Sequence, residues 1–272
     1  MSNNTGEARA RVMAIANQKG GVGKTTTAIN LGTALAACDK AVLVVDLDPQ
    51  GNASTGFGLT RGDRKRNIYK PLLEGSNIHD CIVSSDVPGL SLIPSSVDLA
   101  GAEVELVGAE SRETRLRETL IPLRDSYDYI LIDCPPALGF LTINAFVAAT
   151  SVLVPLQAEF YALEGLSHLM KTIERVRRGF NPALEIQGIV LTMYDKRNNL
   201  CDMVANDVRD YLGDVVFDVV IPRNVRISEA PSHGKPVLLY DMRCAGAQAY
   251  IKMAGEMLRR EKTAVEAPAM AG

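Results

Sequence analysis

A short segment near the start of the chain is rich in lysine, glycine and threonine, the residue types that bind phosphate groups. It consists of Lys19, Gly20, Gly21, Val22, Gly23, Lys24, Thr25 and Thr26. Glycines let a backbone turn tightly, so that its N–H groups converge on phosphate oxygens at the start of a helix. Lys24 can then reach the β- and γ-phosphates, and the Thr25 hydroxyl can bind Mg²⁺. The segment therefore predicts binding of a nucleoside triphosphate together with Mg²⁺.

This segment departs from the usual phosphate-loop pattern. Gln18 stands five residues before Gly23, where the pattern has a glycine, and Lys19 adds a second lysine. A flexible ammonium group at this point brings positive charge toward phosphates that must be neutralised. The alternative is an ordinary tight turn with a solvated lysine. The apolar run at 12–16 and the helix-like run at 24–37 favour the phosphate loop, because this motif joins a strand to a helix.

Three aspartates follow apolar, strand-like runs. Asp46 and Asp48 come directly after the run at 41–45, and Asp133 ends the run at 129–133. In parallel sheets ligands bind beyond the carboxyl ends of the strands, so these carboxylates should lie near the phosphate loop. Asp133 can hold Mg²⁺ through a water molecule, and Asp48 can orient the water that attacks the terminal phosphate. The role of Asp46 is left open, because an aspartate that caps a helix or stabilises a turn would explain this position equally well.

The chain as a whole has the pattern of one α/β domain. Its 272 residues are 47% hydrophobic and only 5% aromatic, as in a parallel sheet that helices cover on both faces. Alternating runs predict a single, mostly parallel twisted sheet flanked by helices on both faces. The expected strands are 12–16, 41–45, 90–94, 129–133, 151–155, 186–192 and 215–220. The expected helices are 24–37, 68–73, 98–106, 112–123, 163–178, 200–212 and 245–261.

The chain ends and the composition indicate the domain boundaries and the cellular compartment. We expect a flexible N-terminal extension at 1–10, the folded domain at 11–262 and a disordered tail at 263–272. The five cysteines are scattered without metal-binding or redox spacing, and we recognise no signal peptide or membrane-spanning run, which predicts a cytoplasmic protein. The net charge of −3 means that any binding to nucleic acid would need a local basic patch.

Five motifs together resemble the ParA/Soj branch of the deviant phosphate-loop ATPases, a group that includes MinD and the nitrogenase iron protein. They are NQKGGVGKTTT at 17–27, VDLDPQGNA at 45–53, YILIDCPP at 129–136, LTMYDKRNNL at 191–200 and IPRNVRISEAP at 221–231. The last two motifs are far more specific to ParA than the phosphate loop is. The resemblance extends over almost the whole chain.

The resemblance implies an ATPase that partitions chromosomes or plasmids, converting ATP and water to ADP and phosphate with Mg²⁺. It implies an ATP-dependent sandwich homodimer in which Lys19 crosses to the partner's phosphates. It also implies that this dimer binds double-stranded DNA without sequence preference, on the nucleoid, and that a ParB-like centromere-binding protein stimulates hydrolysis. The family's catalytic aspartate corresponds to Asp48 and its phosphate-loop lysine to Lys24. Its Mg²⁺ ligands correspond to Thr25 and, through water, Asp133.

Two further sets of contacts follow from the resemblance. The segment Pro222-Arg223-Asn224 matches the family's adenine-binding region. The DNA contacts of the family fall in the C-terminal half, and Arg197 lies at one of them. We expect DNA contacts at Arg197 and Arg226 and weaker ones at Arg223 and Lys235. By charge alone these basic residues could equally form a solvated surface. Because the chain begins close to its first strand, we expect no N-terminal helix-turn-helix domain of the kind that longer family members carry.

Other classes within the same group remain alternatives. A MinD-like membrane-cycling ATPase would need a basic amphipathic C-terminal anchor, and the Ala- and Pro-rich tail does not provide one. An electron-transfer ATPase would need cluster cysteines, of which Cys134 is the only suggestive one. An ATP-dependent carboxylase or amidase would need substrate-binding residues that we do not find in the sequence. A DNA-binding module without enzymatic activity is disfavoured by Asp48 and the intact phosphate loop.

Overall fold

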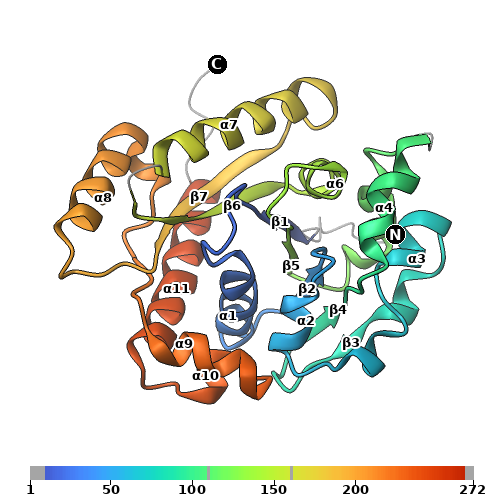
Figure 1. The fold of residues 1–272 in the computed structure, drawn as a ribbon, viewed down its shortest axis with the longest axis horizontal. Coiled ribbons are helices and arrows are strands. Elements are labelled where there is room, and N and C mark those ends of the chain that lie inside the picture. The colour runs from blue at the N-terminus through green and yellow to red at the C-terminus, as the bar shows by residue number, and fades with distance from the viewer. Residues whose placement is uncertain (1–9, 109–110, 160–161, 267–272) are drawn as a thin grey trace, which may run out of the picture.

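A twisted sheet of seven strands forms the centre of the molecule (Figure 1). The computed structural model describes residues 10–108, 111–159 and 162–266. The strands are β1 (Arg11–Ile15), β2 (Val42–Asp46), β3 (Val83–Ser84), β4 (Leu90–Ile93), β5 (Tyr129–Asp133), β6 (Ser151–Gln157) and β7 (Glu185–Thr192). Their order is β3-β4-β2-β5-β1-β6-β7, and all neighbours run parallel except β3, which pairs antiparallel with β4.

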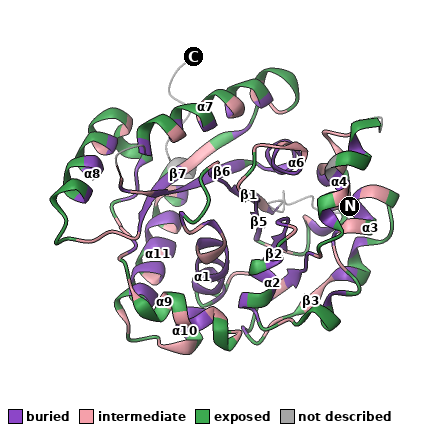
Figure 2. Ribbon diagram, viewed as in Figure 1, coloured by how far each residue is buried: buried purple, intermediate pink, exposed green. Residues whose placement is uncertain are grey.

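Helices cover both faces of the sheet, so the strands are apolar without alternation. Helices α1 (Lys24–Ala36) and α11 (Ala245–Glu266) lie on one face, and α6 (Phe140–Ala148) and α7 (Ala162–Gly179) lie on the other (Figure 1). Successive side chains of β1 point to opposite faces, so Met13 packs in the cluster beneath α1 while Val12 packs in the other cluster. Figure 2 shows the buried strands between helices whose outer sides are exposed. This arrangement confirms the predicted fold class.

The remaining helices lie in the connections, and all but one are short. They are α2 (Asn52–Gly56), α3 (Tyr69–Glu74), α4 (Leu99–Glu105), α5 (Arg115–Leu120), α8 (Asn199–Leu212), α9 (Val225–Glu229) and α10 (Val237–Tyr240). Each helix expected from the sequence is present, with ends shifted by a few residues. The sequence analysis missed α2, α6, α9, α10 and β3. Helix α6 is buried along most of its length, so it has no polar stripe from which a helical period could be recognised.

The strand expected at 215–220 is absent from the structure, and this prediction was wrong. The segment makes one isolated bridge with the edge strand β7, between Val216 and Ile189, and a second bridge joins Pro222, just beyond the segment, to Tyr194. The Glu256 carboxylate on α11 accepts the backbone N–H groups of Asp218 and Val219, each at 2.9 Å. Because these two donors are already bonded to a side chain, the segment does not continue the sheet.

The ends of the domain differ in part from expectation. Helix α11 continues to Glu266, so the folded chain extends beyond the predicted boundary at residue 262. Residues 1–9 and 267–272, for which a flexible extension and a disordered tail were expected, lie outside the described residues. Among the helices that the structure describes, none is long and apolar enough to cross a membrane.

Candidate active site

The phosphate loop lies at the carboxyl edge of the sheet, between β1 and α1. Gly23 precedes α1 with φ of +90°, a conformation that strains any residue with a Cβ atom. The loop is tied to neighbouring strands by two side chains. Thr192, at the end of β7, donates its hydroxyl to the Val22 carbonyl at 2.8 Å, and Asn17 donates to the Pro155 carbonyl at 2.8 Å. The loop is therefore held in its tight turn by the sheet itself.

Lys24 is buried at the base of this loop. Its side chain bends back so that Nζ donates to the Lys19 carbonyl at 2.9 Å, and only 6% of the residue is exposed. Burial lowers the pKa of Lys24, while the nearby Asp133, Cys134 and Asp48 act in the opposite direction. A cation in such a water-poor site attracts phosphate more strongly than a solvated one.

Lys19 has a different environment from Lys24. Its ammonium group forms an ion pair with Glu159, in the loop after β6 of the same chain, and 48% of its side chain is exposed. Lys19 is thus held in its own protomer by a carboxylate, at the solvent-facing side of the loop. A contact with a second protomer would require this ion pair to open.

The three predicted carboxylates come together beside the loop. Asp46 at the end of β2 and Ile15 at the end of β1 are both in register with Asp133 at the end of β5. Both carboxylate oxygens of Asp133 are buried, and no group in the described part of the chain lies in good hydrogen-bonding geometry to them, although the Thr25 hydroxyl is close by. Burial, followed by the charge of Asp46, raises the pKa of Asp133 well above its usual value, and Thr25 and Lys24 oppose this rise.

An unbonded, buried carboxylate beside a threonine hydroxyl fits a bound cation. Buried acidic oxygens are normally hydrogen-bonded, so those of Asp133 require an explanation. The described residues contain no group of three or more His, Cys, Asp or Glu side chains that could enclose a metal ion. Mg²⁺ in nucleotide sites takes only one or two protein oxygens, because phosphates and water supply the rest. Asp133 and Thr25 therefore suit Mg²⁺ carried with a nucleotide.

Asp46 has a structural role, which answers the question that the sequence left open. Its Oδ2 atom accepts the Ser54 backbone N–H at 2.7 Å and the Ser54 hydroxyl at 2.6 Å. Its Oδ1 atom accepts the Asp48 N–H at 3.3 Å. Burial raises the pKa of Asp46 to about 6. The residue anchors the start of α2 and the loop before it.

Asp48 lies on that loop, almost fully buried at the edge of the site. Its Oδ1 atom accepts the Gln50 N–H at 2.9 Å, and its carbonyl accepts the Gly51 N–H at 2.9 Å. The carboxylate is therefore fixed by a compact turn that ends at Gly51. This geometry suits a group that must hold one orientation toward a small reactant such as water.

The segment Pro222-Arg223-Asn224 lies next to the loop that follows β7. Pro222 forms a bridge with Tyr194, and the Arg223 N–H donates to the Tyr194 carbonyl at 3.0 Å. Tyr194 follows Thr192, which contacts the phosphate loop, so the segment borders the nucleotide edge. The Asn224 side chain accepts the Arg226 N–H at 2.9 Å and caps the start of α9. A role of this segment in adenine binding stays a prediction.

Two of the four predicted DNA-binding residues lie in one basic hollow. Arg197 and Arg223 line a cavity of about 670 Å³ together with Lys196 and Lys252, which the sequence analysis did not single out. Arg197 is 88% exposed at its side chain and binds the Asp195 carboxylate through two nitrogens, which lowers the pKa of Asp195 to about 2.

The other two predicted DNA-binding residues do not line this hollow. Arg226 pairs with Glu229 at 2.9 Å and with Asp241 at 3.5 Å, and Lys235 follows Gly234 at an exposed position. Lys252 is an exposed cation of α11. Helical spacing alone could have placed it on the outer side of that helix, but not beside Arg197.

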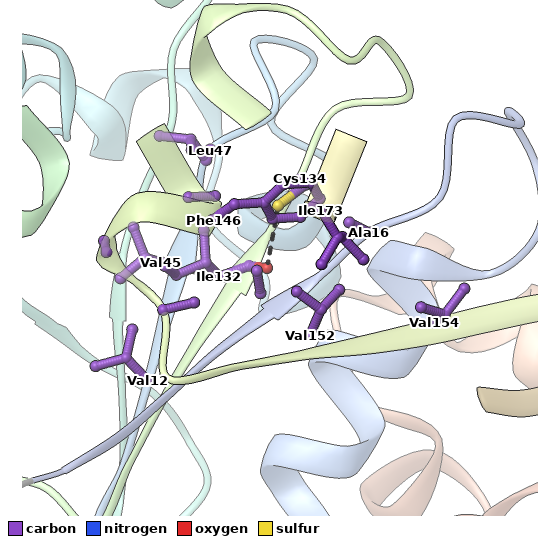
Figure 3. Packing of buried hydrophobic residues seen from close by; sticks show 14 of the residues in the cluster. Val12, Ala16, Val45, Leu47, Ile132, Cys134, Phe146, Val152, Val154 and Ile173 are labelled. Carbon is purple, nitrogen blue, oxygen red and sulfur yellow. Dashed lines mark hydrogen bonds between the residues drawn. The ribbon is translucent and has the colours of Figure 1, made fainter. Parts of the chain in front are cut away.

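Cys134 belongs to the apolar core and not to a redox centre. Figure 3 shows its sulfur among side chains that include Phe146, Val152 and Ile173. Sγ contacts the Ile132 carbonyl at 3.7 Å, and burial raises the pKa of the thiol, which keeps it protonated. All five cysteines are free. These observations give no support to an electron-transfer site.

Comparisons with known proteins place the chain in a family. A family model described as an AAA domain matches residues 10–186. The chromosome partitioning protein ParA of Caulobacter vibrioides is 60% identical over 254 residues, covering 93% of this chain and 95% of that protein. The sporulation initiation inhibitor protein Soj of Bacillus subtilis is 51% identical over 247 residues, covering 91% and 98%.

A solved structure with the same fold belongs to a protein that is not named as a partitioning protein. It is cobyrinic acid a,c-diamide synthase of Mycobacterium smegmatis with bound ADP and magnesium, with 37% identity and a TM-score of 0.82. The match covers 94% of this chain and 96% of that one. The identity to the partitioning proteins is higher and extends equally far. The chain therefore belongs to the ParA/Soj family of chromosome-partitioning ATPases, as its motifs predicted.

Proposed function

We propose that this chain hydrolyses ATP with Mg²⁺ and uses the ATP-bound state to form a homodimer that holds DNA during chromosome or plasmid partitioning. The observation that carries the ATPase part is the unbonded pair of Asp133 oxygens beside Lys24 and Thr25. A buried carboxylate with a raised pKa gains a partner when Mg²⁺ arrives with the nucleotide. The relatives named above share the whole length of the domain with this chain.

The residues divide the work of hydrolysis. The backbone N–H groups of the phosphate loop and Lys24 hold the phosphates. Thr25 and, through water, Asp133 would hold Mg²⁺, which supplies neutralising charge on the phosphate oxygens. Asp48 holds the attacking water in line with the terminal phosphate, and the turn to Gly51 keeps its carboxylate in place.

Dimer formation depends in this proposal on Lys19. Its exposed ammonium leaves Glu159 and binds the phosphates of the nucleotide in the partner subunit. ATP favours this exchange over ADP, because the γ-phosphate adds negative charge that competes with the Glu159 carboxylate. Lys19 is then paired with Glu159 when ADP is bound and with the phosphates in the partner subunit when ATP is bound.

DNA binding is assigned to the basic hollow at Arg197 and Arg223, with Lys196 and Lys252 beside them. Such contacts go to phosphates, so they carry affinity without sequence preference. Dimerisation doubles the number of contacts, and each added contact releases counterions from DNA. A ParB-like centromere-binding protein stimulates hydrolysis, and the DNA-bound dimer associates with the nucleoid.

The experiment that tests this function measures DNA binding and oligomeric state with ADP, ATP and a non-hydrolysable ATP analogue. We expect a dimer and salt-sensitive binding to any duplex DNA with ATP or the analogue, and monomers without DNA binding with ADP. Protein that stays monomeric and fails to bind DNA at low salt with ATP would contradict the assignment. ATP consumption that depends instead on an added carboxylic acid and an amino donor would favour an amide-forming enzyme.

A further inference from the structure

A buried arginine holds the loop that carries Asp48. Arg64 ends the 3₁₀ turn η1 (Arg61–Arg64) and is only 8% exposed. Its Nη1 atom donates to the Gly51 carbonyl at 3.0 Å. Its Nη2 atom donates to the Thr55 hydroxyl at 2.7 Å and to the Leu59 carbonyl at 2.6 Å. All three acceptors belong to the segment that directly follows Asp48.

The surroundings of Arg64 are unusual for a buried cation. No carboxylate in the described part of the chain forms an ion pair with it, and its Nε atom has no hydrogen-bond partner there. Burial lowers the pKa of Arg64, and the charge of Asp46 opposes this effect. A buried cation without an ion pair costs free energy. Stability alone therefore explains this residue poorly, and a role in the geometry of its acceptors explains it better.

Those acceptors connect Arg64 to Asp48 through a single turn. Gly51 has a φ of +66°, and a Cβ atom on it would lie 2.3 Å from Nη1 of Arg64. The Gly51 carbonyl also accepts the Thr55 backbone N–H and hydroxyl, each at 3.0 Å. The Gly51 N–H in turn donates to the Asp48 carbonyl at 2.9 Å. The guanidinium group thus holds the Gly51–Asn52 peptide, which directly follows the peptide whose N–H closes the Asp48 turn.

We propose that Arg64 is a positioning residue for ATP hydrolysis, which fixes the Gly51 turn so that the Asp48 carboxylate faces the attacking water. Among the described residues, the hydrogen bonds of Arg64 go to Gly51, Thr55 and Leu59 and not to the phosphate loop or Thr25, so we expect it to act on the chemical step and not on nucleotide binding. The inference rests on the proposed role of Asp48. Displacing a reacting group by about 1 Å lowers rates by up to about 100-fold. Loss of Arg64 should therefore lower kcat by roughly 10- to 100-fold with KM for ATP unchanged.

The test compares Arg64→Ala, Arg64→Lys and the matched control Arg61→Ala, which removes an exposed arginine from the same turn. The quantities to measure are kcat, KM for ATP and the melting temperature of the full chain. Arg64→Ala should lose kcat with unchanged KM, and Arg64→Lys should recover part of it. Added methylguanidinium should restore activity to Arg64→Ala and leave Arg61→Ala unaffected. A loss that appears in KM or in melting temperature alone, without rescue, would overturn the proposal.

Two more variants keep the inference testable and separate it from the role of Asp48. Thr55→Val removes one acceptor of Arg64 and also the hydroxyl bond from Thr55 to the Gly51 carbonyl, so it should loosen the same turn and lower kcat even where Arg64→Ala does not fold. In the Asp48→Ala background, Arg64→Ala should cause no further loss of kcat, because both changes remove the same contribution. Additive losses would refute positioning through Asp48. Normal activity of Asp48→Ala would refute the proposed catalytic role itself.

Discussion

Lys24 and Lys19 are close in the sequence, but the structure gives them opposite environments. Lys24 is buried against the loop backbone, whereas Lys19 is half-exposed and paired with Glu159. A buried ammonium can serve only the site that it lies in. An exposed one, held by a single carboxylate, can exchange that partner for another anion. The two lysines should therefore fail in different ways when they are removed.

We expect Lys24→Ala to weaken nucleotide binding by roughly 100-fold or more, because it removes a charge-assisted bond in a dry site. Lys19→Ala should keep nucleotide binding but lose ATP-dependent dimerisation. Nucleotide titration and analytical sedimentation with ATP measure the two effects, with Lys70→Ala, an exposed lysine of α3, as control. Normal dimerisation of Lys19→Ala would exclude the cross-subunit role.

Asp48→Ala should slow hydrolysis by roughly 10²- to 10⁴-fold, because it removes the group that orients and activates water. The phosphate loop and Thr25 remain, so the variant should accumulate as an ATP-bound dimer on DNA. Single-turnover hydrolysis and DNA retention measure this outcome. Wild-type turnover in the presence of the stimulating partner would instead direct attention to Asp46 or Asp133.

At the scale of elements, the second strand, its loop and α2 form one hydrogen-bonded unit around Asp46. The carboxylate bonds Ser54 at the start of α2, and the Ser54 hydroxyl accepts the N–H of Ser95 beyond β4. This unit also supports the loop that carries Asp48, because Asp46 accepts the Asp48 N–H. Its stability should depend on whether Asp46 carries a proton.

The pKa of Asp46 is about 6 in the folded protein, above the usual 3.8. A raised folded pKa contributes stability that is full below the unfolded value and is lost as pH rises through the folded value. Between about pH 4 and pH 6 the wild type should therefore lose on the order of 2 kcal/mol relative to Asp46→Asn, which cannot titrate. Urea unfolding across this range measures the difference. Parallel curves for the two proteins would contradict the assignment.

At the scale of the whole molecule, the end of β7 and the loop after it connect the phosphate loop with the basic hollow. Thr192 contacts the phosphate loop, and Arg197, a few residues later, borders the basic hollow. A change at Arg197 should therefore leave nucleotide binding intact. Such a change should affect DNA binding alone.

We expect Arg197→Glu to abolish DNA binding, and Arg226→Glu to weaken it less, without a change in ATP-dependent dimerisation. Contacts with phosphates are independent of sequence, so the loss should be equal for all duplexes, and wild-type affinity should fall steeply with salt. Gel-shift titration at several salt concentrations measures this. Arg178→Glu, an equal charge reversal at the end of α7, should bind normally. Equal losses in both variants would indicate a general charge effect.

Much of this protein could be predicted from sequence, for a definite physical reason. The phosphate loop, Asp48 and Asp133 all lie within a few residues of apolar strands, and parallel strands bring their carboxyl ends to one edge. Apolar runs report burial directly, so β5 was predicted at 129–133 and α8 to within one residue. The five motifs, taken together, indicated the family.

Only the tertiary structure decided which distant side chains satisfy which backbone and charged groups. Glu256 takes the N–H groups of 218–219 and prevents a strand that the apolar pattern favoured. Arg64 bonds the Gly51 turn, Glu159 pairs with Lys19, and Lys252 joins Arg197. Hydrophobic period shows which side of an element is buried, but it carries no information about the partner of a polar group. Those partners depend on how the elements pack.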